Sequence, residues 1–344
     1  MADRLRRYWA SFLRRPWHHK VAILLLLAAL VAALVAATVQ LVSEPDTGLD
    51  VGGPRSEPDP DTRLALETQF APILKLDSRE LLVPIDISSY LSTTTLDERQ
   101  GKKLTLLQDS PSLTTLPETE DGCQAAFNCE YVLDVRGVEP TKSRPQDYRE
   151  IQDKLLANGA RLKVYAQVVR YDDSGDYGVQ YWFLYIYNYR LNFHESDWEQ
   201  ITVGVDKDGT PKKALYSSHS TGFVRDWGDM EHDGDHPVVY VAVGSHANYF
   251  HAGTHAVTVS CPKLFKIRRI CIRKRDIRDR SDGGGQLLLP VNYQLDEFPP
   301  QIFVGSYGAW NYVEHQRLRA DLLDPRTRPA FINPLARLTK GKPL

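Results

Sequence analysis

The hydrophobic and polar positions divide the chain into three stretches. From Val21 to Ala37 every residue is Ala, Val, Ile or Leu, and the apolar run continues almost unbroken through Val42. About 20 apolar residues match the hydrocarbon thickness of a bilayer, so this run predicts a single transmembrane helix over residues 21–42. Residues 43–61 are rich in Pro, Asp, Gly and Glu, and this composition predicts a disordered linker.

The third stretch, residues 62–330, shows the two-residue alternation and the Gly and Asp turns that are typical of β-strands. One helix is expected over residues 146–158. The pattern predicts a mostly β domain, a β-sandwich with a few helices, and a C-terminal tail at residues 331–344. Strands are expected at residues 161–170, 179–189, 199–205, 213–217, 238–243 and 301–305.

Charges on either side of the apolar run orient it. Five Arg and one Lys precede the run against a single acid, Asp3, whereas acids follow it. The positive-inside rule therefore places residues 1–20 in the cytoplasm as a basic tail and the main domain outside it. A cleaved signal peptide is the alternative, with Val35-Ala36-Ala37 as the processing site, although such peptides have shorter apolar cores of about 7 to 15 residues.

Composition limits the remaining possibilities. The 344 residues are 42% hydrophobic, which is enough for one large domain or two small ones with real cores. The formal net charge is −2, so the molecule as a whole does not have the basic surface of a nucleic-acid-binding protein. The four cysteines form two local pairs, Cys123 with Cys129 and Cys261 with Cys271. Outside the cytoplasm we expect two disulfides, with buried free thiols as the alternative.

Candidate chemistry concentrates at the segment His194-Glu195-Ser196-Asp197-Trp198-Glu199. On a strand, Asp197 and Glu199 share one face while Trp198 points to the other. Two carboxylates at this spacing can reach one cation, with His194 approaching from the preceding loop. Seven of the ten histidines lie between residues 194 and 255, which favours a site over an ordinary polar strand face.

Three sequence blocks resemble those of the vacuolar-protein-sorting-related family, a group of largely uncharacterised proteins. They are H-E-x-D-W-E at residues 194–199, Y-S-x-H-x-x-G at residues 216–222, and H-P-V-V-Y-x-A-x-G-S-H-A at residues 236–247. The segment Phe70-Ala71-Pro72-Ile73-Leu74, followed by Leu82-Val83-Pro84-Ile85-Asp86, is similar to the opening segment of that family. The resemblance covers roughly residues 65–330.

A more distant resemblance is to the necrosis- and ethylene-inducing-peptide-like proteins, secreted β-sandwich toxins that bind a divalent cation. It implies metal-associated roles for His194, Asp197 and Glu199. A further aspartate of that family corresponds to Asn188 here, which removes one negative charge, and a later histidine corresponds to His246. The carboxylates favour Ca²⁺ or Mg²⁺, and the histidines leave Zn²⁺ or Mn²⁺ open.

Two further features bear on ligands. In the aromatic strand, Tyr185 and Tyr187 belong to a row of tyrosines on one face, which would suit either a ligand groove for sugars or lipid head groups or an ordinary core edge. Residues 266–275 carry a cluster of Lys and Arg that would suit acidic lipid head groups or an anionic polymer, or would form a solvated loop.

Three functions fit these patterns. The first, which we favour, is a membrane-anchored cation-binding module that engages a polar lipid or glycan. The second is a metal-dependent hydrolase, in which the metal activates water and His219 or His236 moves protons. The third is a purely structural cation. No Ser nucleophile elbow and no two-zinc ligand set is present in the sequence, and the resemblance implies binding more than catalysis.

Overall fold

A computed structural model describes residues 54–100, 103–119, 129–140, 142–190, 193–219, 221–259, 275–308 and 324–338. The chain divides into a unit Met1–Pro45 and a unit Asp46–Leu344, and all described residues belong to the second. The predicted cytoplasmic tail, transmembrane helix 21–42 and linker residues 43–53 lie outside them. In the part of the chain that is described, no helix has the length and apolar character needed to cross a membrane.

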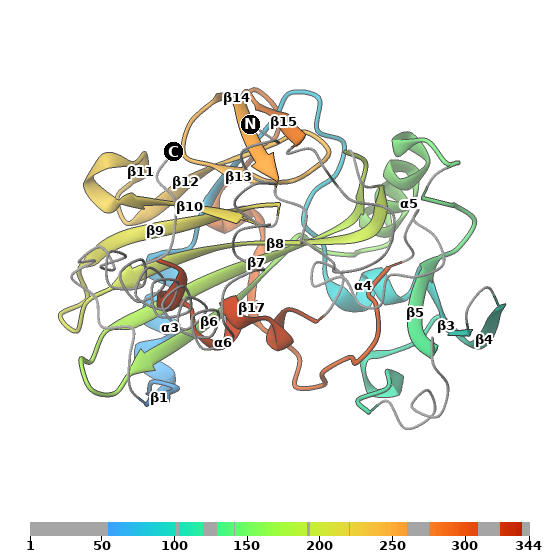
Figure 1. The fold of residues 1–344 in the computed structure, drawn as a ribbon, viewed down its shortest axis with the longest axis horizontal. Helices are drawn as coiled ribbons and strands as arrows, with labels where there is room; N and C mark the ends of the chain where they lie inside the picture. The colour runs from blue at the N-terminus through green and yellow to red at the C-terminus, as the bar shows by residue number, and fades with distance from the viewer. Residues whose placement is uncertain are drawn as a thin grey trace, which may run out of the picture. The chain divides into compact units, whose positions relative to one another are not determined.

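The described unit is mostly β (Figure 1). Its helices are α3 (Pro60–Gln69), α4 (Ile87–Leu91), α5 (Pro145–Ala157) and α6 (Pro329–Ile332), with 3-10 helices η1 (Leu113–Thr115), η2 (Trp227–Asp229), η3 (Pro290–Asn292), η4 (Pro325–Thr327) and η5 (Leu335–Arg337). Its strands are β1 (Arg55–Ser56), β2 (Ile73–Leu76), β3 (Thr94–Gln100), β4 (Lys103–Asp109), β5 (Cys129–Val135), β6 (Lys163–Tyr171), β7 (Tyr177–Asn188), β8 (His194–Val205), β9 (Pro211–Ser218), β10 (Thr221–Asp226), β11 (His232–Asp233), β12 (His236–Val241), β13 (Asn248–Tyr249), β14 (Gly253–Val259), β15 (Arg275–Ser281), β16 (Leu287–Leu288) and β17 (Gln294–Glu297).

The principal sheet is built on the long antiparallel pair β7 and β8, each of 12 residues. Its strand order is β1-β6-β7-β8-β9-β10, and β17 adds a parallel pairing to β6. Both faces of β7 are buried, because aromatic side chains cover each of them. On one face Trp182 and Trp198 meet the ring of Phe298, and on the other face Tyr185 stacks on His246.

A five-stranded mixed sheet, β11-β12-β2-β16 with β13, lies against the principal sheet. The hydroxyl of Tyr216 on β9 donates to the carbonyl of Val238 on β12, which joins the two sheets. Two smaller sheets, β4-β3-β5 and β14-β15, complete the described strands. The mostly β class is confirmed, but the described part contains four sheets rather than the two of a simple sandwich.

Most predicted elements lie where the alternation places them. The helix expected at 146–158 is α5, and five of the six expected strands correspond to β6, β7, β8, β9 and β12. The strand expected at 301–305 is wrong, because these residues form no strand, and only the adjacent Ser306 makes an isolated bridge, to Val132.

The predicted disordered linker is wrong for residues 54–61. β1 pairs with β6, and α3 begins at Pro60 with the Asp59 carboxylate accepting a hydrogen bond from the backbone N–H of Thr62 at 3.0 Å. The C-terminal tail is likewise ordered over residues 331–338, because Leu335 and Leu338 pack against the buried Tyr171. In both segments tertiary contacts provide the apolar burial that composition alone did not indicate.

Candidate functional site

Asp197 and Glu199 lie on one face of β8, as the alternation predicts. Asp197 is paired with Tyr185 of β7 and Glu199 with Phe183, so both carboxyl groups lie on the face of the sheet where Tyr185 stacks on His246. They are almost completely enclosed, with exposures of 4% and 6%. Buried carboxyl groups require hydrogen-bond donors or a positive charge, and the surrounding segments supply them.

Three predicted site residues surround Asp197. The side-chain amide of Asn188 donates to its Oδ2 at 3.0 Å, and Nδ1 of His246 donates to the same oxygen at 2.8 Å. Nε2 of His194 lies 4.0 Å from Oδ1. The structure therefore brings His194, Asn188 and His246 to Asp197. Glu199, two residues along the strand, accepts a hydrogen bond from the hydroxyl of Ser217.

His194 is oriented by its own strand. Its Nδ1 lies 2.7 Å from the carbonyl oxygen of Ser196, to which it donates, so Nε2 is the nitrogen that faces Asp197. Ser196 has a positive φ of 51°, which breaks the regular strand geometry between His194 and Asp197. A histidine that donates one ring nitrogen to a backbone carbonyl presents the other as a potential metal ligand.

Glu80 is a further member of the site, and the sequence analysis did not identify it. Its Oε1 lies 3.4 Å from Nε2 of His246, and its Oε2 accepts a hydrogen bond from the backbone N–H of Gly244 at 2.6 Å. Gly244 has φ +74°, and a Cβ there would meet the ring of Tyr189 at 2.7 Å. Glycine therefore allows the loop to approach Glu80. No local pattern marks Glu80, since its role depends on a distant loop.

The pKa values of Glu199, His246 and Glu80 depend on the charges of neighbouring groups in the cluster. Burial, and then the proximity of Asp197, raise the pKa of Glu199 well above its usual value. Burial lowers the pKa of His246, but Glu80 and Asp197 outweigh it and raise this pKa to about 9. Burial raises the pKa of Glu80, yet His246 more than offsets it, so the pKa is below its usual value. His246 is thus a buried cation held between two carboxylates, and Glu199 favours its protonated form.

Several buried polar atoms around the carboxylates have no hydrogen-bond partner among the described residues. They include Oη of Tyr185 and Oδ1 of Asn248. The ring of Tyr185 stacks on His246 at 3.9 Å with an interplanar angle of 6°. Because unsatisfied buried polar groups are costly, their concentration at one place favours a polar occupant such as water or an ion.

Carboxyl oxygens of Asp197 and Glu199 and the Nε2 of His194 are of the kinds that bind divalent cations, whereas Glu80 lies across the ring of His246 from Asp197. Over the described ranges, however, no three His, Cys, Asp or Glu side chains already stand at the spacing of metal ligands. The reason is local: the imidazolium of His246 lies between Glu80 and Asp197, and Ser217 engages Glu199. An ion would have to replace some of these contacts.

The two other predicted histidines lie elsewhere. Nε2 of His219 is 2.6 Å from Oδ2 of Asp279, which also accepts a hydrogen bond from the hydroxyl of Tyr249 at 2.7 Å. This His219–Asp279 pair is a second polar cluster, and sequence reasoning missed Asp279. Nδ1 of His236 donates to the carbonyl of Ala71 at 2.7 Å. The contacts found for these two histidines in the described structure therefore do not involve Asp197 or Glu199.

The suggested ligand groove at Tyr185 and Tyr187 is not supported by the structure, because both side chains are fully buried. Tyr185 packs on His246, whereas Tyr187 stacks on Tyr148 at 3.8 Å and donates to the carbonyl of Pro140 at 2.6 Å. His246 covers the ring of Tyr185, and Tyr148 of α5 covers the ring of Tyr187.

The predicted disulfides fall largely outside the described residues, which exclude Cys123, Cys261 and Cys271. Cys129 begins β5 and is not a free thiol. The basic cluster at 266–275 also lies outside, except for Arg275 at the start of β15. Both pairings and the lipid-binding role of this cluster stay predictions.

Comparison with known proteins gives limited results. No family model matches the chain, and no curated protein matches it. Among solved structures, NLPPya in complex with glucosamine is similar at 15% sequence identity and a TM-score of 0.28, covering 59% of this chain and 72% of that chain. NLPPya in complex with mannosamine gives 15%, a TM-score of 0.29 and the same coverages of 59% and 72%. This is a distant structural likeness, and the resemblance to the vacuolar-protein-sorting-related family stays a prediction.

Proposed function

We propose that this protein is a membrane-anchored extracytoplasmic module that binds a divalent cation and engages a polar lipid or glycan. The anchor is inferred from the apolar run at residues 21–42 and its basic flank. The cation is inferred from one observation in particular: Asp197 and Glu199 are buried on one strand face, with Nε2 of His194 4.0 Å from Asp197, beside polar atoms that have no hydrogen-bond partner among the described residues.

Asp197 and Glu199 would hold the ion, with His194 as a nitrogen ligand. When bound, the cation would supply the positive charge that these buried acids otherwise obtain from a proton on Glu199 and from His246. The oxygen-rich set favours Ca²⁺ or Mg²⁺, and the imidazoles keep Zn²⁺ or Mn²⁺ compatible. Because Asp197, Glu199 and His246 are buried, we assign the cation to holding the strands together rather than to contacting the ligand.

No contact favours the hydrolase alternative. His219 engages Asp279 and His236 engages the backbone of Ala71, so neither is placed to move a proton at Asp197 within the described residues. The proposal therefore keeps the binding function, with the cation in a structural role.

The test is thermal unfolding of the full chain in detergent, first with chelator and then with Ca²⁺, Mg²⁺, Mn²⁺ or Zn²⁺. At 100 times the dissociation constant, a bound ion stabilises the folded state by about 2.7 kcal/mol. We expect the parent to respond to at least one ion, and Asp197→Asn and Glu199→Gln to lose that response. In chelator Asp197→Asn should be less stable, because it weakens the pairing of His246, whereas Glu199→Gln should not be.

Glu195→Gln is the matched control. Glu195 is a fully buried acid on the same strand, but it accepts hydrogen bonds from Tyr148 and from the backbone of Val135, outside the cluster. This variant should keep the metal response. If the parent does not respond to any of the ions, or if both cluster variants retain the response, the cation proposal is wrong.

A further inference from the structure

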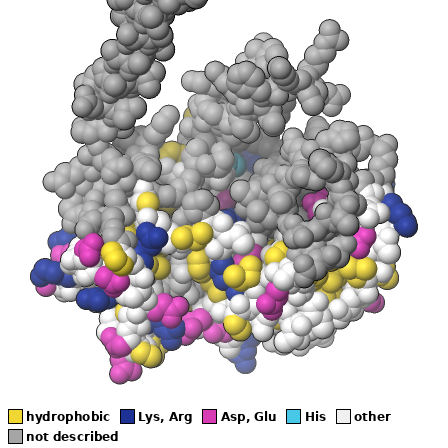
Figure 2. Space-filling view, turned by 60° about the horizontal axis from the view of Figure 1, so that its bottom comes forward, with side chains coloured by type: hydrophobic (Ala, Val, Ile, Leu, Met, Phe, Trp, Pro, Cys, Tyr) yellow, Lys and Arg dark blue, Asp and Glu magenta, His cyan; other side chains and the backbone are white. Residues whose placement is uncertain are grey.

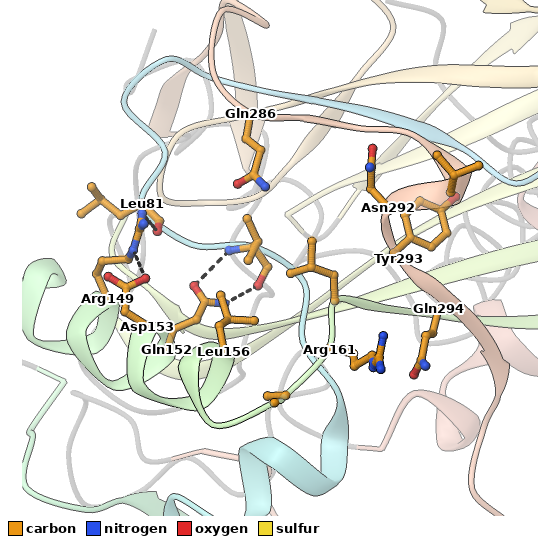
Figure 3. A pocket seen from close by; sticks show the side chains of 15 residues that line it. Leu81, Arg149, Gln152, Asp153, Leu156, Arg161, Gln286, Asn292, Tyr293 and Gln294 are labelled. Atoms are coloured by element: carbon orange, nitrogen blue, oxygen red, sulfur yellow. Dashed lines mark hydrogen bonds and ion pairs between the residues drawn. The ribbon is translucent and has the colours of Figure 1, made fainter.

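A cavity of about 560 Å³ lies away from the carboxylate cluster. It is bordered by the C-terminal half of α5, the loop that follows it, the segment around Leu81, and residues 286–294, as Figure 3 shows. This volume is within the usual range of about 300–1,000 Å³ for small-molecule sites. None of the residues assigned above to the cation site lines it.

The wall of the cavity presents hydrogen-bond donors that the protein does not use. Arg161 is exposed and makes no ion pair or hydrogen bond within the described structure. The side-chain amides of Gln286 and Gln294 also have no such partner, and Figure 3 shows Gln286 pointing into the cavity. Oδ1 of Asn292 accepts from the backbone N–H of Leu289 at 2.8 Å, so its amino group remains as a donor.

Other polar groups of the wall are already engaged. Arg149 donates to Asp153 at 2.6 Å. The side-chain amide of Gln152 donates to the carbonyl of Val83 at 2.7 Å and accepts from the backbone N–H of Val83 at 3.2 Å. Pairing Arg149 with Asp153 leaves the charge of Arg161 uncompensated on this wall. Arg161 and the amino group of Asn292 are donors, and the amides of Gln286 and Gln294 each offer a donor beside an acceptor. With one uncompensated positive charge, this wall fits a negatively charged ligand with several polar oxygens.

An apolar strip lies between Gln286 and Asn292, two residues that line the cavity. Leu287, Leu289 and Val291 are 50%, 37% and 86% exposed, whereas Leu288 between them is 1% exposed. Val291 itself lines the cavity. Figure 2 shows apolar side chains interspersed with charged ones of both signs on the surface, and β4 carries a similar exposed group at Leu104, Leu106 and Leu107. The strip at residues 287–291 differs in its position beside the polar cavity. A polar cavity with an apolar border has the amphipathic character of a lipid at a bilayer surface.

We propose that this cavity binds the phosphate-bearing head group of an anionic lipid, with its acyl chains against Leu287, Leu289 and Val291. Arg161 pairs with the phosphate, and the amides of Gln286 and Gln294 donate to head-group oxygens. The inference deepens the proposed function and rests on it, since it assigns the polar ligand to a place separate from the cation.

The experiment is isothermal titration of the full chain in detergent with dihexanoyl-phosphatidylglycerol, corrected for titration into empty micelles. We expect Arg161→Gln to weaken binding at least 10-fold, and Val291→Ser to weaken it at least 3-fold. Two matched variants should bind within 2-fold of the parent: Arg170→Gln, an arginine at the other end of β6, and Leu106→Ser, an exposed leucine of β4. Both cavity side chains are exposed, so we expect unchanged unfolding temperatures.

Two further probes identify what the cavity recognises. Inorganic phosphate and dihexanoyl-phosphatidylcholine should each bind at least 10-fold more weakly, because one lacks the acyl chains and the other lacks net negative charge. Equal binding of inorganic phosphate, with Val291→Ser unchanged, would show a free-phosphate site and overturn the proposal. Binding that survives Arg161→Gln would also overturn it. Glu199→Gln, which tests the cation, should retain lipid binding, so the two proposals can fail independently.

Discussion

His246 shows how one side chain acquires its properties from residues far apart in the sequence. It is fully buried, its ring stacks on Tyr185, and its two nitrogens face Glu80 and Asp197. An isolated buried histidine would lose its proton, because a low dielectric disfavours charge. Here the two carboxylates reverse that preference and raise the pKa to about 9.

This raised pKa predicts a loss of stability at alkaline pH. The folded pKa of His246 is above its unfolded value, so its contribution is complete below about pH 6.5 and is lost as the pH rises through about 9. The difference corresponds to about 3 kcal/mol. In chelator, we expect the free energy of unfolding from urea titrations to fall between pH 7.5 and 9.5.

His246→Gln is the control for that measurement. It should be less stable than the parent at pH 7.5, because Asp197 and Glu80 lose their cation, and its stability should change little up to pH 9.5. A parent whose stability is constant over this range, or a variant with the same slope, would contradict the assignment.

At the scale of elements, β7, β8 and α5 are joined through polar side chains as well as apolar ones. The hydroxyl of Tyr148 on α5 donates to Oε1 of Glu195 on β8 at 2.8 Å, and its ring stacks on Tyr187 of β7. Oε2 of Glu195 accepts from the backbone N–H of Val135 on β5 at 2.9 Å. Glu195 of β8 thus connects that strand to α5 and to β5.

We expect Tyr148→Phe to lower the free energy of unfolding by about 1–3 kcal/mol, because a buried acid loses a donor while the stacked ring is kept. Tyr187→Phe is the matched variant, since it loses only a hydrogen bond to the neutral carbonyl of Pro140 and should cost about 0.5–1.5 kcal/mol. Urea titration with unchanged m-values would measure both. Equal effects of the two variants would argue against a special role for Glu195.

At the scale of the whole molecule, the arrangement of anchor and domain is the main prediction. Protease added outside sealed vesicles should degrade the domain and leave a short protected N-terminal fragment, because the basic flank precedes the apolar run. Fragments identified by mass spectrometry would give the boundary. Complete protection of the domain would reverse the orientation, and a soluble form that starts near Thr38 would establish a signal peptide instead.

Elements with a strong local pattern were predictable from the sequence. The alternation at β7 and β8 was sufficient to put Asp197 and Glu199 on one face, because the period of a strand is a property of neighbouring residues. The helix at α5 was recognised for the same reason. The mostly β class followed from the number of such segments.

Long-range contacts fix which residues meet at the site and which side chains are exposed to water. Glu80 lies close to His246 because β2 and β12, which precede them, pair in parallel. No sequence pattern near residue 80 predicts that pairing. Tyr185 and Tyr187 have the pattern of a half-exposed face, but His246 and Tyr148 cover them. The linker residues 54–61 are ordered through contacts with distant strands. Such contacts join residues far apart in the chain, so the local periodicity of the sequence does not predict them.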